Sequence, residues 1–445
     1  MANNEKLRQL GLDKAAFLGL LVLGLIWAEF ITFSRSDFKL SEPLAIKGTG
    51  IEVSIPSGDG WKRLSNNFKY EDNEFNLVCQ MQIGNDSLIL AQWRYFTLPL
   101  EKTPSERFKI KANSLSGSVK SEGSGKFGDF TFDYAKVVSE KTPAVLFCGT
   151  TVLPDGRTIT LEVAQRGQGV DLAEKIFKSL LASVKYHPDN PVVNGAELLK
   201  KLKASLPAML SRQGYQNYYR IKDAHGTIVG FTTDTIISPA DSNADSAVFA
   251  AGLLFVSPAF SAFAEQSLFY SDISISRFDW TIKHGNLLTN RQQPTQISLD
   301  GSKVLTVQKQ NTVEKVHSTD TMIPDIFLDL TVAEFLKSDF DTVMLEVILS
   351  DGKIAPVIFS RINSPETSVL PAESAAGVEL FGSNTVYQKM YFDGEGKLLS
   401  ADIQGSLSYR IERTTKTAIL ADFPQWLEKI QQIEQYQLKK NSRPK

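Results

Sequence analysis

Few residues in this chain are of the types that carry out chemistry. Its 445 residues include two cysteines and four histidines, too few for a disulfide framework or a four-thiolate metal site. Cys79 alternates with Phe75, Leu77 and Met81 along a strand-like segment, and this pattern favours a buried apolar thiol. Cys148 lies in a second strand-like segment, and in an oxidising compartment the alternative is a disulfide between Cys79 and Cys148.

The other reactive side chains form no catalytic or cofactor-binding pattern. His225 and His284 each stand next to a glycine in an expected turn, where turn residues are commoner than metal ligands. His317 and Asp320 lack the G-x-S-x-G motif that would present a serine nucleophile. Residues 123–126, Gly-Ser-Gly-Lys, lack the glycine spacing of a phosphate-binding loop. We therefore assign no catalytic residue, no metal ligand and no cofactor.

A long uncharged segment is the strongest candidate for ligand binding. Residues 246–264 are nineteen in number and carry no charge, which would suit the apolar lining of a cavity on a curved sheet. The side chains that could form this lining are Phe249, Leu253, Phe255, Phe260 and Phe263. A pair of buried strands or an apolar loop is the commoner arrangement of such a segment. A second membrane span is disfavoured because no lysine or arginine flanks the segment.

These residues follow an expected membrane anchor. Residues 15–34 carry only one charge, Glu29, and twenty helical residues span about 30 Å of hydrocarbon. Basic residues precede this span, so the positive-inside rule places residues 1–14 in the cytoplasm. We expect a single-pass protein of the bacterial cytoplasmic membrane with its body outside the cytoplasm, in the periplasm. The alternative is a cleaved secretory signal, Ala15 to Ala28, which would release the same body.

Residues 45–187 are expected to fold as an α+β domain, an antiparallel sheet covered by helices. Residues 75–83 and 88–96 predict a hairpin, and Thr103-Pro104-Ser105-Glu106 is a capping box that begins a helix. With Gly60-Trp61-Lys62-Arg63 near its start and a closing helix over 173–180, this domain resembles the PsbP-like superfamily. The resemblance implies a non-enzymatic binding or assembly factor, and it carries over no functional residue.

Residues 194–438 are expected to form a second, larger domain built from a mostly antiparallel curved sheet with a few helices. Turns that contain glycine repeatedly join apolar segments in this region. The segment 196–213 predicts an amphipathic helix whose lysines, Lys203 among them, face solvent. A further helix is expected from Ile326 to Leu336, with Asp325 and Asp329 on its solvated side.

The end of the chain predicts a helix over 422–440, followed by a basic tail over 439–445. Trp426, Leu427 and Ile430 are expected to face inward. From Tyr218-Tyr219 through Gly230-Phe231 and the long strands after it, the second domain resembles curved-sheet domains of bacterial envelope proteins, including the LolA-like lipoprotein carriers. This resemblance implies an apolar or lipid ligand.

Charge and composition narrow the class of function. A net charge of -2 and 22% charged residues provide no basic field for nucleic acid. We expect a membrane-anchored extracytoplasmic protein that binds a protein partner in the envelope without catalysis. The alternative is a carrier of a lipid or other apolar ligand in the second domain. A hydrolase or isomerase assembled across the fold is the third hypothesis.

Overall fold

The computed structural model describes most of the chain from residue 38 to residue 431. Its internal gaps are 70–73, 84–86, 168–169, 211–214, 238–247, 257–262, 273, 287–290, 363–370, 372, 382–385 and 404–407. The expected span at 15–34 and the basic tail at 439–445 lie outside the described residues. Within the described residues, no helix is both long and apolar enough to cross a bilayer.

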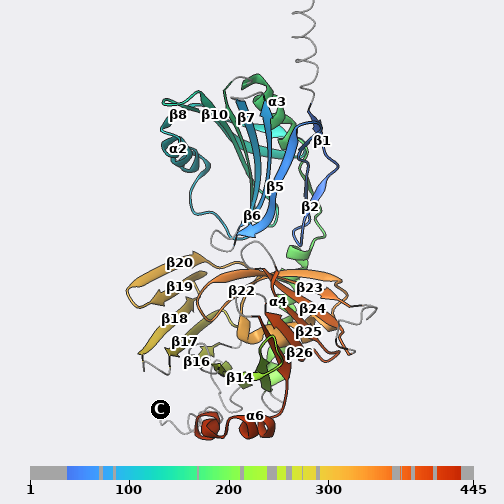
Figure 1. The fold of residues 1–445 in the computed structure, drawn as a ribbon, viewed down its shortest axis with the longest axis vertical. Helices are drawn as coiled ribbons and strands as arrows, with labels where there is room; N and C mark the ends of the chain where they lie inside the picture. The colour runs from blue at the N-terminus through green and yellow to red at the C-terminus, as the bar shows by residue number, and fades with distance from the viewer. Residues whose placement is uncertain are drawn as a thin grey trace, which may run out of the picture.

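The described chain forms two sheet domains that meet end to end (Figure 1). In the first domain, the described strands of the main sheet have the order β5-β6-β7-β11-β10-β9-β8, and every neighbouring pair is antiparallel. These strands are β5 (Trp61–Lys69), β6 (Glu74–Ile83), β7 (Ser87–Phe96), β8 (Gly117–Phe127), β9 (Phe130–Ser139), β10 (Ala144–Val152) and β11 (Thr158–Arg166). The predicted hairpin of residues 75–83 and 88–96 is confirmed as β6 and β7.

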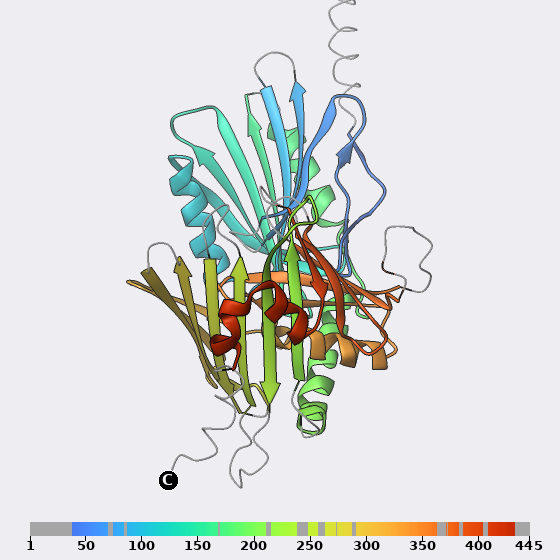
Figure 2. The same cartoon turned by 60° about the horizontal axis from the view of Figure 1, so that its bottom comes forward.

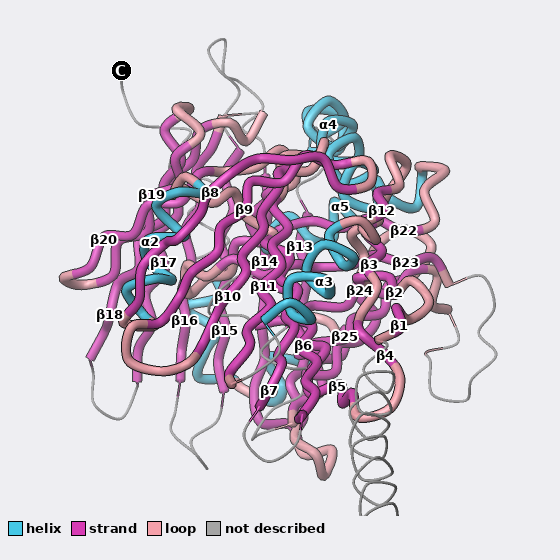
Figure 3. Tube along the Cα trace, turned by 90° about the horizontal axis from the view of Figure 1, so that it is seen from above, coloured by secondary structure: helices cyan, strands magenta, loops and turns pink. Residues whose placement is uncertain are grey.

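Two helices cover opposite faces of this sheet. Helix α2 (Pro104–Ser114) packs on β8 and β9, and α3 (Val170–Leu181) packs on β10 and β11 (Figure 3). The predicted capping box is confirmed, because the Thr103 N–H donates to the Glu106 carboxylate at 2.8 Å and the Thr103 hydroxyl accepts from the Glu106 N–H. The cap satisfies backbone donors that the first helical turn leaves free.

Short strands complete the first domain. Strands β1 (Lys39–Leu40) and β4 (Pro56–Ser57) form one pair, and β2 (Leu44–Ile46), β3 (Ile51–Val53) and β12 (Lys185–Tyr186) form a small sheet. Ile51 and Val53 of β3 join the core beneath α3. The small sheet therefore closes this side of the core.

Helix α4 (Pro191–Leu210) connects the domains and begins earlier than its apolar periodicity predicts. The Asn190 side chain accepts from the Val192 N–H at 2.9 Å, and Pro191 takes the first helical position, where its missing N–H costs nothing. The two prolines of residues 187–191 predict a short stiff linker, because proline disfavours helix in the residue before it. The helix nevertheless begins at Pro191, within that expected linker. Val192 contacts Met344 and Ile358 of the second domain, and Phe75 of the first domain packs against the same cluster.

The described strands of the second domain form one fifteen-stranded sheet. Its order is β20-β19-β18-β17-β16-β15-β14-β13-β27-β26-β25-β24-β23-β22-β21. The strands are β13 (Tyr215–Lys222), β14 (Ile228–Ile237), β15 (Val248–Val256), β16 (Phe263–Ser271), β17 (Arg277–Asn286), β18 (Arg291–Asp300), β19 (Val304–Lys309), β20 (Thr312–His317), β21 (Met322–Pro324), β22 (Thr342–Ile348), β23 (Ile354–Arg361), β24 (Ala376–Phe381), β25 (Val386–Phe392), β26 (Leu398–Ile403) and β27 (Tyr409–Arg413). Only the pair β21 and β22 is parallel among these strands.

The sheet curves around α4, the 3-10 turn η2 (Asp325–Phe327) and α5 (Leu328–Lys337). Phe327 contacts Phe269 of β16, with ring centroids 5.1 Å apart, and Phe335 contacts Phe359 of β23 at 5.9 Å. Both halves of the sheet therefore share one core with these helices. The helix predicted between Ile326 and Leu336 is confirmed.

The C-terminal segment covers the outer face of the same sheet, as Figure 2 shows. Helix α6 (Lys416–Asp422) and the turn η3 (Pro424–Trp426) are followed by helical residues 427–431, so the helical region begins before residue 422, where it was predicted to start. Trp426 and Ile430 pack inward as predicted. Leu427 is 41% exposed and was wrongly predicted to face inward, because it follows Trp426 by one residue and lies on another side of the helix.

Candidate ligand-binding site

A cavity of about 160 Å³ lies where the two edges of the second sheet come together. Strand β20 is one edge and β21 is the other, and residues 318–321, here named the seam segment, connect them. A connection of this length spans at most about 18 Å. The edges are therefore close although they lie at opposite ends of the strand order.

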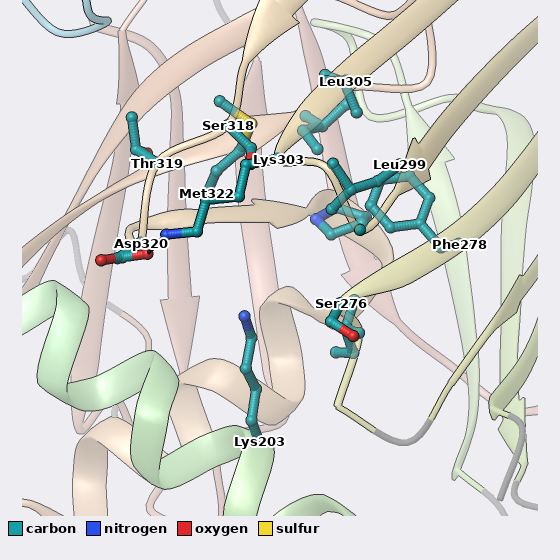
Figure 4. A pocket seen from close by; sticks show the side chains of 14 residues that line it. Lys203, Ser276, Phe278, Leu299, Lys303, Leu305, Ser318, Thr319, Asp320 and Met322 are labelled. Atoms are coloured by element: carbon teal, nitrogen blue, oxygen red, sulfur yellow. Dashed lines mark hydrogen bonds and ion pairs between the residues drawn. The ribbon is translucent and has the colours of Figure 1, made fainter. Parts of the chain in front are cut away.

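The wall of the cavity is largely apolar and is set by strand register. Phe278 of β17 pairs with Leu299 of β18, which pairs with Leu305 of β19. Cross-strand partners point to the same face of a sheet, so these three side chains form one continuous row. The remaining apolar lining residues are Ile275, Met322, Pro324 and Ile348. Figure 4 shows the side chains that line the cavity, with ten of them labelled.

Two lysines reach the polar side of the cavity from different elements. Lys203 projects from α4, and Lys303 comes from the turn between β18 and β19 (Figure 4). The Lys303 Nζ lies 3.2 Å from the Asp320 Oδ1, and both side chains are more than two-thirds exposed, at 71% and 79%. Burial lowers the pKa of Lys203, an effect opposed by Asp320 and Asp272. Lys203 has no ion-pair partner among the described residues.

The seam segment is fixed by a buried ionic network that joins the two domains. Arg157, the residue directly before β11 in the first domain, places its Nη2 2.5 Å from the Glu346 Oε1 and donates to the Thr321 hydroxyl at 2.6 Å. The Thr319 hydroxyl donates to the other Glu346 oxygen at 3.0 Å. Side-chain exposure is 5% for Arg157 and 0% for Glu346. The first domain therefore holds the segment that separates the cavity from the domain junction.

A second, more open cavity of about 300 Å³ lies between the domains, against the same segment. Lys303, Ser318, Thr319 and Asp320 line both cavities, so the inner cavity borders the junction directly. Asp155 and Arg157 form part of the outer wall. A ligand reaching the inner cavity from this side would pass between the domains.

Several acidic side chains lie partly buried within the second domain. Burial raises the pKa of Asp234 to about 7, and repulsion from Asp329 and Glu265 adds to the effect. Burial also raises the pKa of Asp325 well above its usual range. The His284 Nδ1 lies 3.2 Å from the Glu265 carboxylate. The solvated position predicted for Asp325 is therefore wrong, and no group of His, Cys, Asp or Glu among the described residues could hold a metal ion.

The uncharged segment 246–264 contributes strand β15 and the first two residues of the neighbouring strand β16. Residues 257–262, between these strands, lie outside the described residues. Leu253 and Phe255 face outward and pack beneath the C-terminal segment, with the Phe255 ring 4.7 Å from that of Trp426. These two residues therefore pack against other side chains and are not among those that line the cavity behind the seam segment. Phe260, and the side chains of Phe249 and Phe263, lie outside the described residues.

The two cysteines are free and buried. Cys79 pairs with Ala91, Ala91 with Val163, and Val163 with Phe147, the residue before Cys148. Three strand spacings of about 4.8 Å each separate Cys79 from this position, and Cys148 points to the opposite face of the sheet. A disulfide needs Cα atoms within about 7 Å, so this geometry fits buried thiols and does not permit the bridge.

The residues of the cavity were not singled out by sequence reasoning. Lys203 was predicted on a solvated helix face, because its neighbours Lys200 and Lys201 suggest one continuous basic surface. Its position becomes clear only when β17, β19 and β21 are brought against α4. The alternation of apolar residues in those strands can be recognised in the sequence. The sequence does not show which edges of the sheet come together.

Comparison with known proteins gives weak similarities of fold. No family model matches this sequence, and no curated protein matches it. A beta-barrel-like protein of unknown function from Brucella abortus matches with a TM-score of 0.33 and 9% identity, covering 45% of this chain and 96% of that chain. The Ran-binding protein Mog1p of Saccharomyces cerevisiae matches with a TM-score of 0.24 and 10% identity, over 34% of this chain and 96% of that chain.

LprF from Mycobacterium bovis matches with a TM-score of 0.14 and 8% identity, covering 51% of this chain and 93% of that chain. The class that the structure defines is a two-domain, mostly antiparallel α+β protein.

Proposed function

We propose that this protein is a binding protein whose second domain holds a small apolar or amphiphilic ligand. The observation that supports the proposal is the cavity of about 160 Å³ behind the seam segment. An apolar cavity of about 150 Å³ is large enough for one benzene-sized group. The size suits the end of an acyl chain or a single ring, rather than a whole two-chain lipid.

The position of the cavity also supports binding. The cavity lies beside a domain junction, where ligand sites are common. Its border carries polar groups that could orient a ligand, including Ser318 and Thr319.

We also propose that the binding domain acts outside the cytoplasmic membrane, tethered by residues 15–34. The support for this part comes from the sequence alone, through the apolar span and the basic residues before it. Protease protection of spheroplasts would test it. Digestion of the body from outside is expected, and protection of the body would contradict the proposed orientation.

Native mass spectrometry of the full chain, purified gently from its host, tests ligand binding. We expect a bound small molecule that is released on denaturation and recovered by lipid extraction. Leu299→Trp should fill the cavity and abolish the bound mass. The control Val313→Trp changes a side chain that is 59% exposed on the edge strand β20, and it should leave the bound mass unchanged. An empty wild-type protein that also fails to bind added octanol would overturn the proposal.

A further inference from the structure

We infer that the ligand of this cavity is an anionic amphiphile, with a carboxylate or phosphate head held between Lys203 and Lys303 and an apolar end against Phe278, Leu299 and Leu305. This inference rests on the proposed function and names the chemical class of its ligand. It is carried by the position of two cations at one side of a cavity whose other lining side chains are mostly apolar, with Ser276, Ser318, Thr319 and Asp320 as the polar exceptions.

Lys203 provides the first part of the argument. Its ammonium group is half-buried beside the cavity, and no carboxylate among the described residues forms an ion pair with it. The two nearby carboxylates are engaged elsewhere. Asp320 pairs with Lys303, and Asp272 accepts from the Ser276 hydroxyl, from the Ser276 N–H at 2.7 Å and from the Arg277 N–H at 3.3 Å.

A half-buried charge without a partner is costly, and an anion that enters the cavity would remove that cost. Burial already lowers the pKa of Lys203, which is the effect expected for an ammonium group deprived of water. A bound carboxylate or phosphate would reverse this effect.

Lys303 provides the second cation without a large penalty. Its ion pair with Asp320 is highly exposed on both sides, and exposed pairs of this kind contribute little stability. Lys303 can therefore turn from Asp320 to a ligand head at small cost. Because Lys303 lines both cavities, it is suited to meet the head of a ligand arriving from the domain junction.

The apolar end follows from the row of cross-strand partners. Phe278, Leu299 and Leu305 are adjacent on one sheet face, and Met322 and Ile348 close the cavity from the other edge of the sheet. A ligand with a charged head and a short apolar end matches this division better than a neutral hydrocarbon does.

Calorimetric titration of the full chain tests the inference. The four single-chain probes are octanoate, octyl phosphate, octanol and octylamine. We expect the two anions to bind at least about tenfold more tightly than octanol, since a hydrogen bond to a charged group contributes more than about 1.4 kcal/mol. Octylamine should bind most weakly. Tighter binding of octanoate would indicate a fatty-acid type of head, and tighter binding of octyl phosphate would indicate a phospholipid type of head.

Single substitutions of the lysines test where the anionic head of the ligand binds. Lys203→Met should reduce the preference for octanoate over octanol by about tenfold or more, and Lys203→Arg should retain it. Lys200→Met, an exposed lysine on the same helix, is the matched control and should change nothing. Thermal unfolding of each variant checks folding, and Lys303→Met provides a second test if Lys203→Met does not fold.

The outcomes separate the two proposals. If octanol binds as tightly as octanoate, the cavity binds apolar ligands, and the inference of an anionic head group is wrong. If the preference for anions persists unchanged in both Lys203→Met and Lys303→Met, the head site is not the one inferred. If no probe binds, the proposed function itself fails.

Discussion

At the residue scale, the ion pair between Arg157 and Glu346 is the most consequential contact between the domains. Both side chains are almost fully buried, and Glu346 also accepts hydrogen bonds from Thr319 and Thr321. A buried pair of this kind adds little over well-packed apolar residues, but the loss of one partner leaves an unpaired buried charge. Its contribution is therefore best measured by removing one partner and then both.

Arg157→Met should destabilise the protein by about 3–5 kcal/mol, because Glu346 would remain buried without its cation. The double variant Arg157→Met with Glu346→Met should recover much of this loss. Urea unfolding of both variants measures the effect. Lys178→Met, which removes an exposed i, i+4 pair with Glu174, is the control and should cost less than about 0.5 kcal/mol. A similarly small loss in Arg157→Met would contradict the buried pair.

The raised pKa of Asp234 predicts that the stability of the protein depends on pH. Its pKa is about 7 in the folded protein, mainly because of burial, against about 4 in the unfolded chain. The folded state therefore holds the proton more tightly, and the free energy of unfolding falls as pH rises through this interval and levels off above it.

Asp234→Asn removes this titration. We expect the variant to be more stable than the wild type by up to about 4 kcal/mol above pH 7, and similar to it near pH 4. Denaturant unfolding at a series of pH values measures the difference. Asp59→Asn, at an exposed turn, provides the comparison. A stability difference that does not change with pH would refute the role given to Asp234.

At the element scale, the contact between α4 and β22 sets the position of Lys203. Gly195 lies in the first half of α4, and a Cβ atom there would stand 2.2 Å from the Met344 carbonyl oxygen. Glycine is unfavourable inside a helix, so its presence here reflects the close approach of helix and strand. The same approach brings the rest of α4 against the sheet.

Gly195→Ala should therefore destabilise the protein by about 1–3 kcal/mol through overpacking, although alanine has the better helix propensity. Ala204→Gly, at an exposed position of the same helix, should cost about 1 kcal/mol from propensity alone. Thermal unfolding distinguishes the two effects. A more stable Gly195→Ala protein would show that α4 lies farther from β22.

Elements whose signals are local could be predicted from the sequence. The capping box at Thr103 and the hairpin of β6 and β7 depend on neighbouring residues, and both were predicted. The start of α4 was missed because Asn190 and Pro191 were interpreted as a linker, although asparagine followed by proline also favours a helix start. Leu253 and Phe255 alternate correctly as strand residues, but alternation does not say which face of a sheet is the inner one.

At the scale of the whole molecule, the cavity could not be predicted because it depends on contacts between distant segments. The two edges of the second sheet come together because β21, which follows β20 in the chain, pairs in parallel with β22 at the opposite end of the strand order. The seam segment is then held by Arg157, which is 189 residues from Glu346 in sequence. No local pattern marks such a contact.

The buried pair also predicts coupling between the domains. Arg157→Met should speed amide hydrogen exchange in the seam segment, residues 318–321, because Thr321 and Glu346 lose their link to the first domain. Exchange in α6, which lies on the outer face of the second sheet at the end away from the junction (Figure 1), should be unchanged. Mass spectrometry of peptides from the full chain measures both. Equal protection of the seam segment in the variant and the wild type would rule out the coupling.

The strand order of the second sheet has a consequence for how the chain folds during synthesis. Strand β13 pairs with β27, and Lys222 of β13 bonds Glu412 of β27, 190 residues later in the chain. Strands β14 to β20 can pair as they leave the ribosome, but β13 keeps one open edge until β27 has been made. The nascent domain thus exposes an unpaired strand for most of its translation, the condition under which chains aggregate or recruit chaperones.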